Sequence, residues 1–249
     1  VKQREDAWKE NSMADILKMM TNLADLVYFS ARKLSSSRGG GICTNRKDLY
    51  SKMETLVPLY EGFLTYGGIS VREVEAMAVG LYETLDETMI SQSPSFIKYM
   101  VETLDSLGIP VITPPGVLGG HVDASQFCPH IPQSEYPAGA LAAALYLISG
   151  VRGMERGTIS SVLYENGNEI LADVELVRLA IPRRGFTLSQ INYVIDRLQW
   201  LYDNRELIGG LKFCYEPTVL RFFMGGLEPT SDWPERLVAK FRKDFGNSL

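Results

Sequence analysis

The stretch LVYFSARK, from Leu26 to Lys33, decides the fold of this chain. Its first four residues are apolar and of high strand propensity, so they predict a buried strand. The strand delivers Lys33, flanked by Arg32 and the hydroxyl of Ser30, into the turn LSSSRGGG at 34–41. A protonated lysine is no nucleophile, but burial and a neighbouring cation both lower the pKa of its amine. Lys33 is therefore a candidate Schiff-base lysine, and a solvated surface lysine is the alternative.

The overall composition argues against several classes of function. The chain has 249 residues, of which 45% are hydrophobic and 22% charged, as in a globular protein with one large or two small domains. Its net charge of -5 and its pI of about 5.2 argue against a nucleic-acid partner and against an anionic membrane. The longest apolar run, at 138–148, is too short and too interrupted to span a membrane.

The three cysteines, Cys43, Cys128 and Cys214, are isolated in the sequence. Their spacing fits no metal-binding motif, so no metal site is expected. An odd number of scattered cysteines is typical of a reducing compartment, which predicts a cytoplasmic protein. Each cysteine is interpreted as a small hydrophobic residue of the core.

Helical patterns predominate in the first hundred residues. Apolar residues at helical spacing predict helices over 12–22, 47–59 and 71–89. Gly39–Cys43 predicts the strand that returns from the Lys33 turn, and 61–68 is a glycine-rich loop. At Ser93 and Pro94 a hydroxyl cap precedes a proline, so a further helix is expected to begin there and to end at Gly108.

Beyond residue 108, short strands alternate with helices, as in an α/β domain. Strands are predicted at 111–112, 122–123, 151–154, 177–181 and 211–215, and helices at 134–149 and 187–207. Asn166-Gly167 predicts a tight hairpin turn. The alternation favours a mixed sheet covered by helices.

A series of short motifs extends over most of the chain. In order they are Ser30–Lys33, Glu61–Gly68, Glu75–Leu81, Gly119–Ala124, Pro129–Pro132, Val151–Gly157, Val177–Arg184, Gly210–Phe213, Tyr215–Pro217 and Leu220–Phe223. In this order and spacing, from Val1 to about Met224, the chain resembles the β-eliminating lyases, the family of tryptophanase and tyrosine phenol-lyase that depends on pyridoxal 5'-phosphate (PLP). The resemblance implies an α/β fold, that of the PLP-dependent transferases of fold type I, which is similar to aspartate aminotransferase.

Members of that family are about twice as long, so the resemblance implies that this chain is their second half. Residues 1–70 then complete the large PLP-binding domain, 71–108 are connecting helices, 109–225 form the small α/β domain, and 226–249 are a C-terminal appendage. The other half would supply the aromatic residue that stacks on PLP, the aspartate at its pyridine nitrogen, most phosphate ligands and a tyrosine acid. A tight association with this N-terminal half is expected, as is assembly into a homo-oligomer, either a dimer or a tetramer.

The resemblance also implies roles for the lysine motif and for one strand. Lys33 binds PLP as the Schiff base and later moves the α-proton of the substrate. Ser30 donates a hydrogen bond to the cofactor phosphate, and Arg32 replaces a lysine of the family. Arg178 is the arginine that binds the carboxylate of the amino-acid substrate through two parallel hydrogen bonds, with a buried structural ion pair as the alternative. His121 is interpreted as a residue that orients others.

Further residues are implied to bind the side chain of the substrate. They are Arg156, Phe222, Phe223, Phe63 and Tyr66. An arginine at the position of Arg156 engages the phenolic hydroxyl in tyrosine phenol-lyases, and an ion pair with Glu155 or with another carboxylate is the alternative. Phe222 also follows the phenol-lyases, whereas Phe63 follows the tryptophanases. Tyr66 lies near the subunit interface in the family.

The expected reaction is a β-elimination like that of tyrosine phenol-lyase, which releases the substrate side chain with pyruvate and ammonia. The family binds a monovalent cation through an asparagine, and this chain has Arg38 at that position, which could fill the cation site with a fixed charge. A carbon–sulfur lyase that acts on cysteine or S-substituted cysteine is therefore an alternative. A non-catalytic paralogue or scaffold module is a further alternative.

Overall fold

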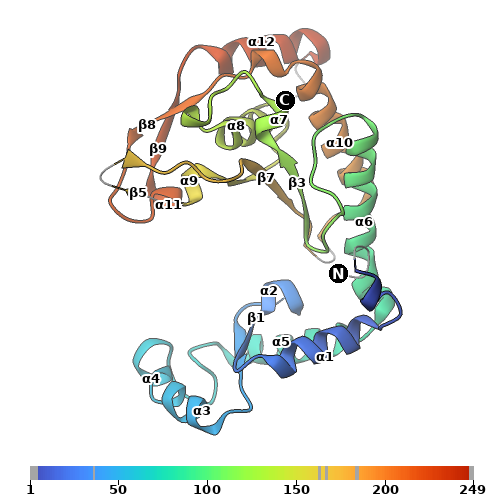
Figure 1. Cartoon of the computed structure of the whole chain (residues 1–249), viewed down its shortest axis with the longest axis vertical. Helices are drawn as coiled ribbons and strands as arrows, with labels where there is room; N and C mark the ends of the chain where they lie inside the picture. The colour runs from blue at the N-terminus through green and yellow to red at the C-terminus, as the bar shows by residue number, and fades with distance from the viewer. Residues whose placement is uncertain (1–4, 36, 162–163, 166–167, 183–184, 247–249) are drawn as a thin grey trace. The chain divides into compact units, whose positions relative to one another are not determined.

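The structure is a computed structural model that describes residues 5–35, 37–161, 164–165, 168–182 and 185–246. The chain divides into two compact units, Val1–Gln92 (unit 1) and Ser93–Leu249 (unit 2), which Figure 1 shows in blue to cyan and in green to red. The buried residues of the hydrophobic core cluster all come from position 97 onward. Unit 2 therefore holds the core of the described chain.

Unit 1 is built from short helices and one β-hairpin. The helices are η1 (Asp6–Trp8), α1 (Met13–Leu23), α2 (Ala31–Leu34), α3 (Lys47–Glu54), α4 (Val57–Tyr60) and α5 (Val71–Glu83). Strands β1 (Val27–Ser30) and β2 (Gly40–Cys43) pair antiparallel, with Ser30 opposite Gly40, so the hairpin predicted around Lys33 is confirmed.

Unit 1 buries little apolar surface by itself. Among its described residues, Ile16 and Ala31 are the only buried hydrophobic ones. Tyr28 on β1 is 79% exposed, so the prediction of a buried strand at 26–29 is wrong for this chain. The physical reason is that β1 belongs to a sheet of only two strands, which is too small to cover its own faces.

Helix α6 (Glu87–Ser106) contains the border between the two units. The helix continues through Pro94, so the prediction of a new helix that begins at Ser93 is wrong. The Ser93 hydroxyl does not cap a helix; it donates a hydrogen bond of 3.0 Å to the carbonyl of Ile181. A proline inside a helix removes one backbone hydrogen bond, so the helix is locally weakened where the two units meet in the sequence.

Unit 2 alternates short strands with helices, as predicted. Its elements are β3 (Gly119–Asp123), α7 (Ala124–Phe127), η2 (Gln133–Glu135), α8 (Pro137–Ser149), β4 (Met154–Arg156), α9 (Thr158–Ser161), β5 (Tyr164–Glu165), β6 (Asn168–Glu169), β7 (Leu176–Ala180), α10 (Leu188–Asp203), η3 (Arg205–Leu207), β8 (Leu211–Tyr215), α11 (Arg221–Met224), β9 (Gly226–Pro229) and α12 (Trp233–Phe245). The strands β5 and β6 pair antiparallel, and the predicted turn Asn166-Gly167 between them lies outside the described residues.

The main sheet of unit 2 has the strand order β3-β7-β4, and each described pair in it is antiparallel. The expected mixed sheet is therefore wrong. Strands β3 and β4 run in the same direction with α8 between them in the chain, and β7 inserts between them, so no parallel pair forms. On one face of the sheet Val122, Val177 and Leu179 are buried in the core with residues of α6, α8 and α10.

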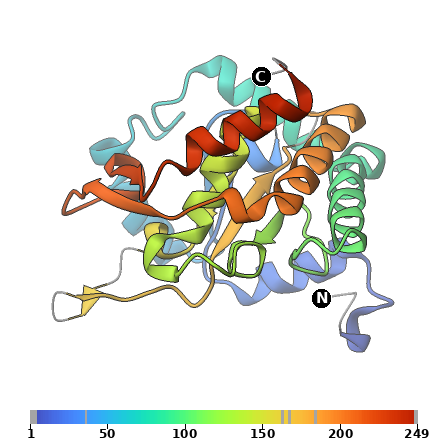
Figure 2. The same cartoon turned by 90° about the horizontal axis from the view of Figure 1, so that it is seen from above.

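The C-terminal segment 226–249 is part of unit 2 and is not an appendage, which corrects the expectation from the sequence. Strand β9 pairs with β8, and α12 packs against α8 (Figure 2). Trp233, Leu237 and Phe241 recur every four residues on α12 and are fully buried. An apolar stripe at this spacing forms one helix face, which explains why the segment joins the core.

Candidate functional site

The lysine segment joins β1 directly to the single helical turn of α2. The amide of Ala31 donates to the carbonyl of Gly39 at 3.0 Å, and the amide of Ser35 donates to the carbonyl of Ala31 at 2.8 Å. Gly80 of α5 approaches so closely that a Cβ there would lie 2.0 Å from the carbonyl oxygen of Ser35. Backbone contacts within unit 1 therefore fix the turn that carries Lys33.

The functional groups of this segment face solvent. Lys33, Arg32 and Arg38 are exposed, and none of them forms an ion pair within the described part of the chain. The hydroxyl of Ser30 caps no helix and is exposed as well. The burial of Lys33 that the strand pattern predicts is absent: α5 covers the side of α2 that carries Ala31 and Ser35, and Lys33 lies on the exposed side. A free amine, free cations and a free hydroxyl on one turn fit a ligand with an aldehyde and a phosphate.

Phe63 and Tyr66 lie together on the glycine-rich loop of unit 1. Their ring centroids are 5.6 Å apart, and Phe63 is 69% exposed. Gly68 has a φ of +76°, and a Cβ there would lie 2.0 Å from the carbonyl oxygen of Glu61. Only glycine fits this position, so the loop closes on itself and presents the two aromatic rings side by side.

In unit 2, the predicted arginines lie on the face of the sheet opposite the core. Arg178, on the central strand β7, pairs in register with His121 on β3 and with Met154 on β4. Arg156 is two residues beyond Met154 on the same strand. Residues two apart on a strand share a face, and so do residues in register. The fold therefore gathers Arg178, Arg156 and His121 on one surface.

This surface carries the positive charges of Arg178 and Arg156. Burial, followed by the charges of Arg178 and Arg156, lowers the pKa of His121, so its imidazole is neutral near pH 7. Neither arginine forms an ion pair with a described residue. A half-buried guanidinium without a carboxylate partner, beside a neutral imidazole, is suited to bind a carboxylate from outside the chain.

Glu155 does not pair with Arg156, so that alternative is wrong. The two residues are neighbours on β4 and point to opposite faces of the sheet. Glu155 is 6% exposed, and neither of its carboxylate oxygens has a hydrogen-bond partner within the described residues. Burial, with a smaller contribution from the charge of Glu175, raises the pKa of Glu155 to about 7.

This buried carboxyl predicts that the protein loses stability as the pH rises. The unfolded chain releases the proton of Glu155 near pH 4.5, and the folded chain holds it to about pH 7. Between these values the folded state binds more protons, so the free energy of unfolding decreases by up to about 3 kcal/mol. We expect Glu155→Gln to flatten this dependence in chemical unfolding between pH 5 and pH 8. Equal slopes for the variant, the wild type and the exposed-site control Glu165→Gln would contradict the assignment.

Glu175 is a buried carboxylate that sequence analysis did not single out. It is 2% exposed and accepts hydrogen bonds from the amide and the hydroxyl of Thr158, at 2.8 and 2.6 Å, and from the amide of Ala138 at 3.3 Å. Helix N-termini favour negative charge, and these amides belong to the first turns of α8 and α9. A Cβ on Gly157 would lie 2.4 Å from the carboxylate. Glu175 therefore anchors the chain directly after Arg156.

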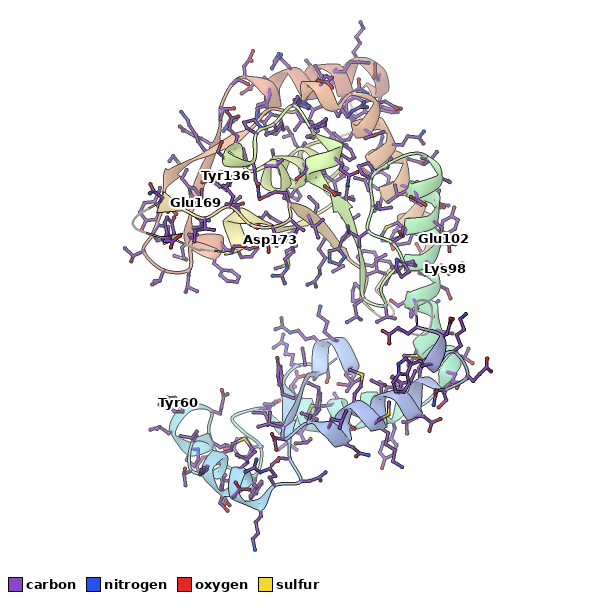
Figure 3. The ribbon with its side chains drawn as sticks, in the orientation of Figure 1. Tyr60, Lys98, Glu102, Tyr136, Glu169 and Asp173 are labelled. Atoms are coloured by element: carbon purple, nitrogen blue, oxygen red, sulfur yellow. The ribbon has the colours of Figure 1, made fainter. Side chains whose placement is uncertain are left out.

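Arg221 is a second residue that sequence analysis missed, although it lies within the motif Leu220–Phe223. Its side chain is 1% exposed and forms ion pairs with Glu169 at 2.5 Å and with Glu216 at 2.8 Å. Hydrogen bonds from Tyr164 and from Arg221 lower the pKa of Glu216, which keeps this carboxylate ionised. Tyr136 donates to Glu169 at 3.0 Å, and Figure 3 labels both side chains. An arginine before two aromatic residues was the available sequence signal.

Phe222 and Phe223 follow Arg221 on the short helix α11. Their rings meet edge to face with centroids 5.0 Å apart. Phe222 packs partly against the core, whereas Phe223 is 74% exposed. The aromatic pair is thus placed at the surface of unit 2 by the buried guanidinium beside it.

A cavity of about 380 Å³ lies in unit 2, and none of the predicted site residues lines it. Its walls come from α6, the 150–152 segment, the end of β7 and α10, and they are mainly apolar. It is therefore separate from the arginines of the sheet face.

The cysteines are free in the described structure. Cys128 is buried, and burial raises the pKa of its thiol to about 12, so its interpretation as a core residue is confirmed. Cys43 and Cys214 are exposed, so the same interpretation is wrong for them, because both lie on two-stranded sheets that leave one face open. No group of three or more metal-ligating side chains occurs within the described residues, and no described helix is long and apolar enough to cross a membrane.

Comparison with known proteins identifies relatives of about twice the length. No protein-family model matches the chain. Tyrosine phenol-lyase of Lacrimispora saccharolytica is 42% identical over 232 residues, which cover 92% of this chain and 50% of that protein. Tryptophanase of Salinibacter ruber is 39% identical over 230 residues, which cover 92% of this chain and 49% of that protein. The chain spans about half the length of the curated relatives that it matches.

Solved structures show the fold. A high-resolution structure of SPT with a PLP internal aldimine has a TM-score of 0.51 at 13% identity and covers 77% of this chain and 43% of that chain. Serine palmitoyltransferase from S. paucimobilis with a bound PLP-myriocin aldimine has a TM-score of 0.50 at 14% identity and covers 74% of this chain and 41% of that chain. The chain therefore has part of the α/β fold of type I PLP-dependent transferases, and it is a homologue of the C-terminal half of the β-eliminating lyases named tyrosine phenol-lyase and tryptophanase.

Proposed function

We propose that this chain is the C-terminal half of a PLP-dependent lyase that removes the β-substituent of an amino acid and releases it with pyruvate and ammonia. The observation that carries the proposal is the unpaired guanidinium of Arg178 beside the neutral His121 on the open face of the sheet. The identity to tyrosine phenol-lyases and tryptophanases supports the same reaction class.

The lysine segment would hold the cofactor. Lys33 supplies the amine for the covalent link, the hydroxyl of Ser30 donates a hydrogen bond to the phosphate, and Arg32 adds a positive charge beside it. When bound, PLP supplies an electron sink that stabilises negative charge at the α-carbon. The amine of Lys33 would also act as the general base that takes the α-proton of the substrate.

Separate residues would bind the two ends of the substrate. Arg178 binds the α-carboxylate through the two parallel donors of its guanidinium. His121 beside it is neutral, so it does not compete with Arg178 for the carboxylate. Arg156 donates to a hydroxyl on the substrate side chain, and Phe222 and Phe223 contact the aromatic ring. Phe63 and Tyr66 form the aromatic pair of unit 1 and would contribute from their loop.

The exposed apolar surface of unit 1 supports a partner half. Leu23, Tyr28, Val71, Tyr82 and Leu85 are each more than 70% exposed, which is unfavourable in water. An N-terminal half that adds strands beside β1 and β2 would cover this surface and supply the remaining cofactor ligands. We propose that such pairs assemble into a homo-oligomer, and that the three free cysteines reflect a reducing cytoplasm.

Substrate selectivity tests the proposed function. In the full-length protein we expect pyruvate release from tyrosine, and we expect Arg156→Ala to reduce the rate with tyrosine about 10- to 100-fold because a charged hydrogen bond to the phenol is lost. Rates with S-alkyl cysteines should change little, since they offer no hydroxyl.

A control variant and two other outcomes separate the phenol-lyase proposal from its alternatives. Arg152→Ala is the matched control, because Arg152 is an exposed arginine shortly before the same strand. Turnover of S-alkyl cysteines without turnover of tyrosine would replace the phenol-lyase proposal by a carbon–sulfur lyase. A protein that binds no PLP and releases no pyruvate would support a scaffold role.

A further inference from the structure

We propose that Arg221 is a positioning residue that couples the segment carrying Arg156 to the segment carrying Phe222 and Phe223, and so sets the selectivity for the substrate side chain. This inference rests on the proposed function for the role of those three residues. Its structural part, the coupling of the two segments, rests on contacts within unit 2 alone.

The guanidinium of Arg221 reaches α9, the helix that begins two residues after Arg156. Its Nε donates to the carbonyl of Ile159 at 3.1 Å, and its Nη2 donates to the carbonyl of Thr158. The same Thr158 is held from the other side by the carboxylate of Glu175, which accepts from the amide and from the hydroxyl of Thr158. The chain after Arg156 is thus fixed between a buried cation and a buried anion.

The guanidinium also holds its own segment and the β5–β6 hairpin. Nη1 donates to Tyr164 at 2.7 Å on β5 and pairs with Glu216, and Nη2 pairs with Glu169 on β6. Each donor group therefore has a partner, and the partners come from α9, β5, β6 and the loop before α11. A planar guanidinium serves several fixed acceptors at once, whereas the single ammonium of a lysine cannot reach them all.

Backbone conformation supports the same cluster. Tyr136 and Leu220 are the two non-glycine residues with positive φ among the described residues, at 55° and 57°. Leu220 directly precedes Arg221, and the hydroxyl of Tyr136 donates to Glu169, the ion-pair partner of Arg221. A positive φ is unfavourable for a residue with a Cβ. Such a conformation persists where surrounding contacts stabilise it, often at functional sites. Both residues with positive φ thus adjoin the contacts of Arg221, one in the chain and one through Glu169.

The coupling can be tested by hydrogen exchange on the full-length protein. The amide of Ser161 bonds the carbonyl of Gly157 on the α9 side, and the amide of Gly225 bonds the carbonyl of Arg221 on the α11 side. We expect Arg221→Lys, which keeps one positive charge for the paired carboxylates of Glu169 and Glu216, to speed exchange of both amides about tenfold, which corresponds to the loss of one charged hydrogen bond. The amides of β3, at 119–123, should be unchanged.

A matched control is Arg205→Lys. Arg205 also donates to a carbonyl, that of Tyr202 at 2.7 Å, and stacks on an aromatic ring, but it lies on η3. The variant Arg205→Lys should leave the exchange rates of the Ser161 and Gly225 amides unchanged. Unchanged exchange in Arg221→Lys, faster exchange on only one side, or an equal increase in β3 would each overturn the coupling.

Kinetics separate positioning from a general loss of structure. We expect Arg221→Lys to raise the KM for tyrosine about tenfold and to leave kcat for S-methylcysteine unchanged, because only tyrosine uses the side-chain contacts. An equal loss of kcat for both substrates would overturn the role in selectivity. If the wild-type protein turns over no amino acid, the proposed function fails, and the exchange measurement still decides the coupling.

Discussion

Replacement of Lys33 by alanine is expected to reduce β-elimination by the full-length protein about 100- to 10,000-fold, the range that a positioned general base contributes. Lys33 is exposed on α2, the turn that follows β1, and it makes no ion pair within the described chain. The same variant should lose the PLP label that borohydride reduction fixes covalently to the protein. Peptide mapping of the reduced wild-type protein should place the label on Lys33.

Lys47→Ala is the matched control for this experiment, since Lys47 is an exposed lysine that begins α3 in the same unit. It should retain both the activity and the label. Label on any other lysine, or activity retained in Lys33→Ala, would refute the assignment. Arg32→Ala distinguishes the role of the neighbouring positive charge from that of the Lys33 amine. This variant should keep the covalent PLP label on Lys33 but bind the cofactor phosphate more weakly.

Replacement of Arg178 by alanine is expected to weaken substrate binding by about 2–5 kcal/mol, which is about 30- to 5,000-fold in Kd. The guanidinium lies on the central strand of the three-stranded sheet and forms no ion pair with a described residue, so alanine removes the cation that we propose for the carboxylate. Spectral titration of the PLP-loaded protein with tyrosine measures the change. Arg178→Lys should bind with intermediate affinity, because it keeps the charge and loses the planar fork.

The carboxylate contact can be isolated with tyramine, which lacks that group. The penalty of Arg178→Ala should be large for tyrosine and close to zero for tyramine. An equal penalty for both ligands would show that Arg178 acts on the structure of the sheet. The control Arg152→Ala should affect neither ligand, since Arg152 is exposed and lines the cavity of unit 2 that contains none of the predicted site residues.

Local patterns in the sequence determine the elements that carry the candidate site. The four apolar residues before Ser30 and the glycines at 39–41 specify the hairpin because strand propensity and turn geometry are properties of adjacent residues. The spacing of apolar residues likewise determines α1, α8 and α10. The apolar run before Ser30 also singles out Lys33, whereas Arg178 and the aromatic pair Phe222–Phe223 are candidates because the resemblance to the β-eliminating lyases implies their roles.

Tertiary structure alone decides which of these residues are buried, paired or free. Periodicity predicts that β1 is buried, but burial needs neighbours that unit 1 does not contain, and Tyr28 is 79% exposed. The segment 226–249 looks like a charged tail, yet the apolar stripe from Trp233 to Phe241 enters the core because α8 offers a complementary face.

Tertiary structure also decides which charged side chains are paired. Arg221 obtains its partners from residues up to 63 positions away in the chain, at Thr158 and Ile159, whereas Glu155 is buried without a hydrogen-bond partner among the described residues. Sequence by itself determined most of the helices and strands, since these depend on neighbouring side chains, and its resemblance to a known family supplied the candidate site residues. Pairing and burial depend on contacts between distant segments, and only the folded chain decides them.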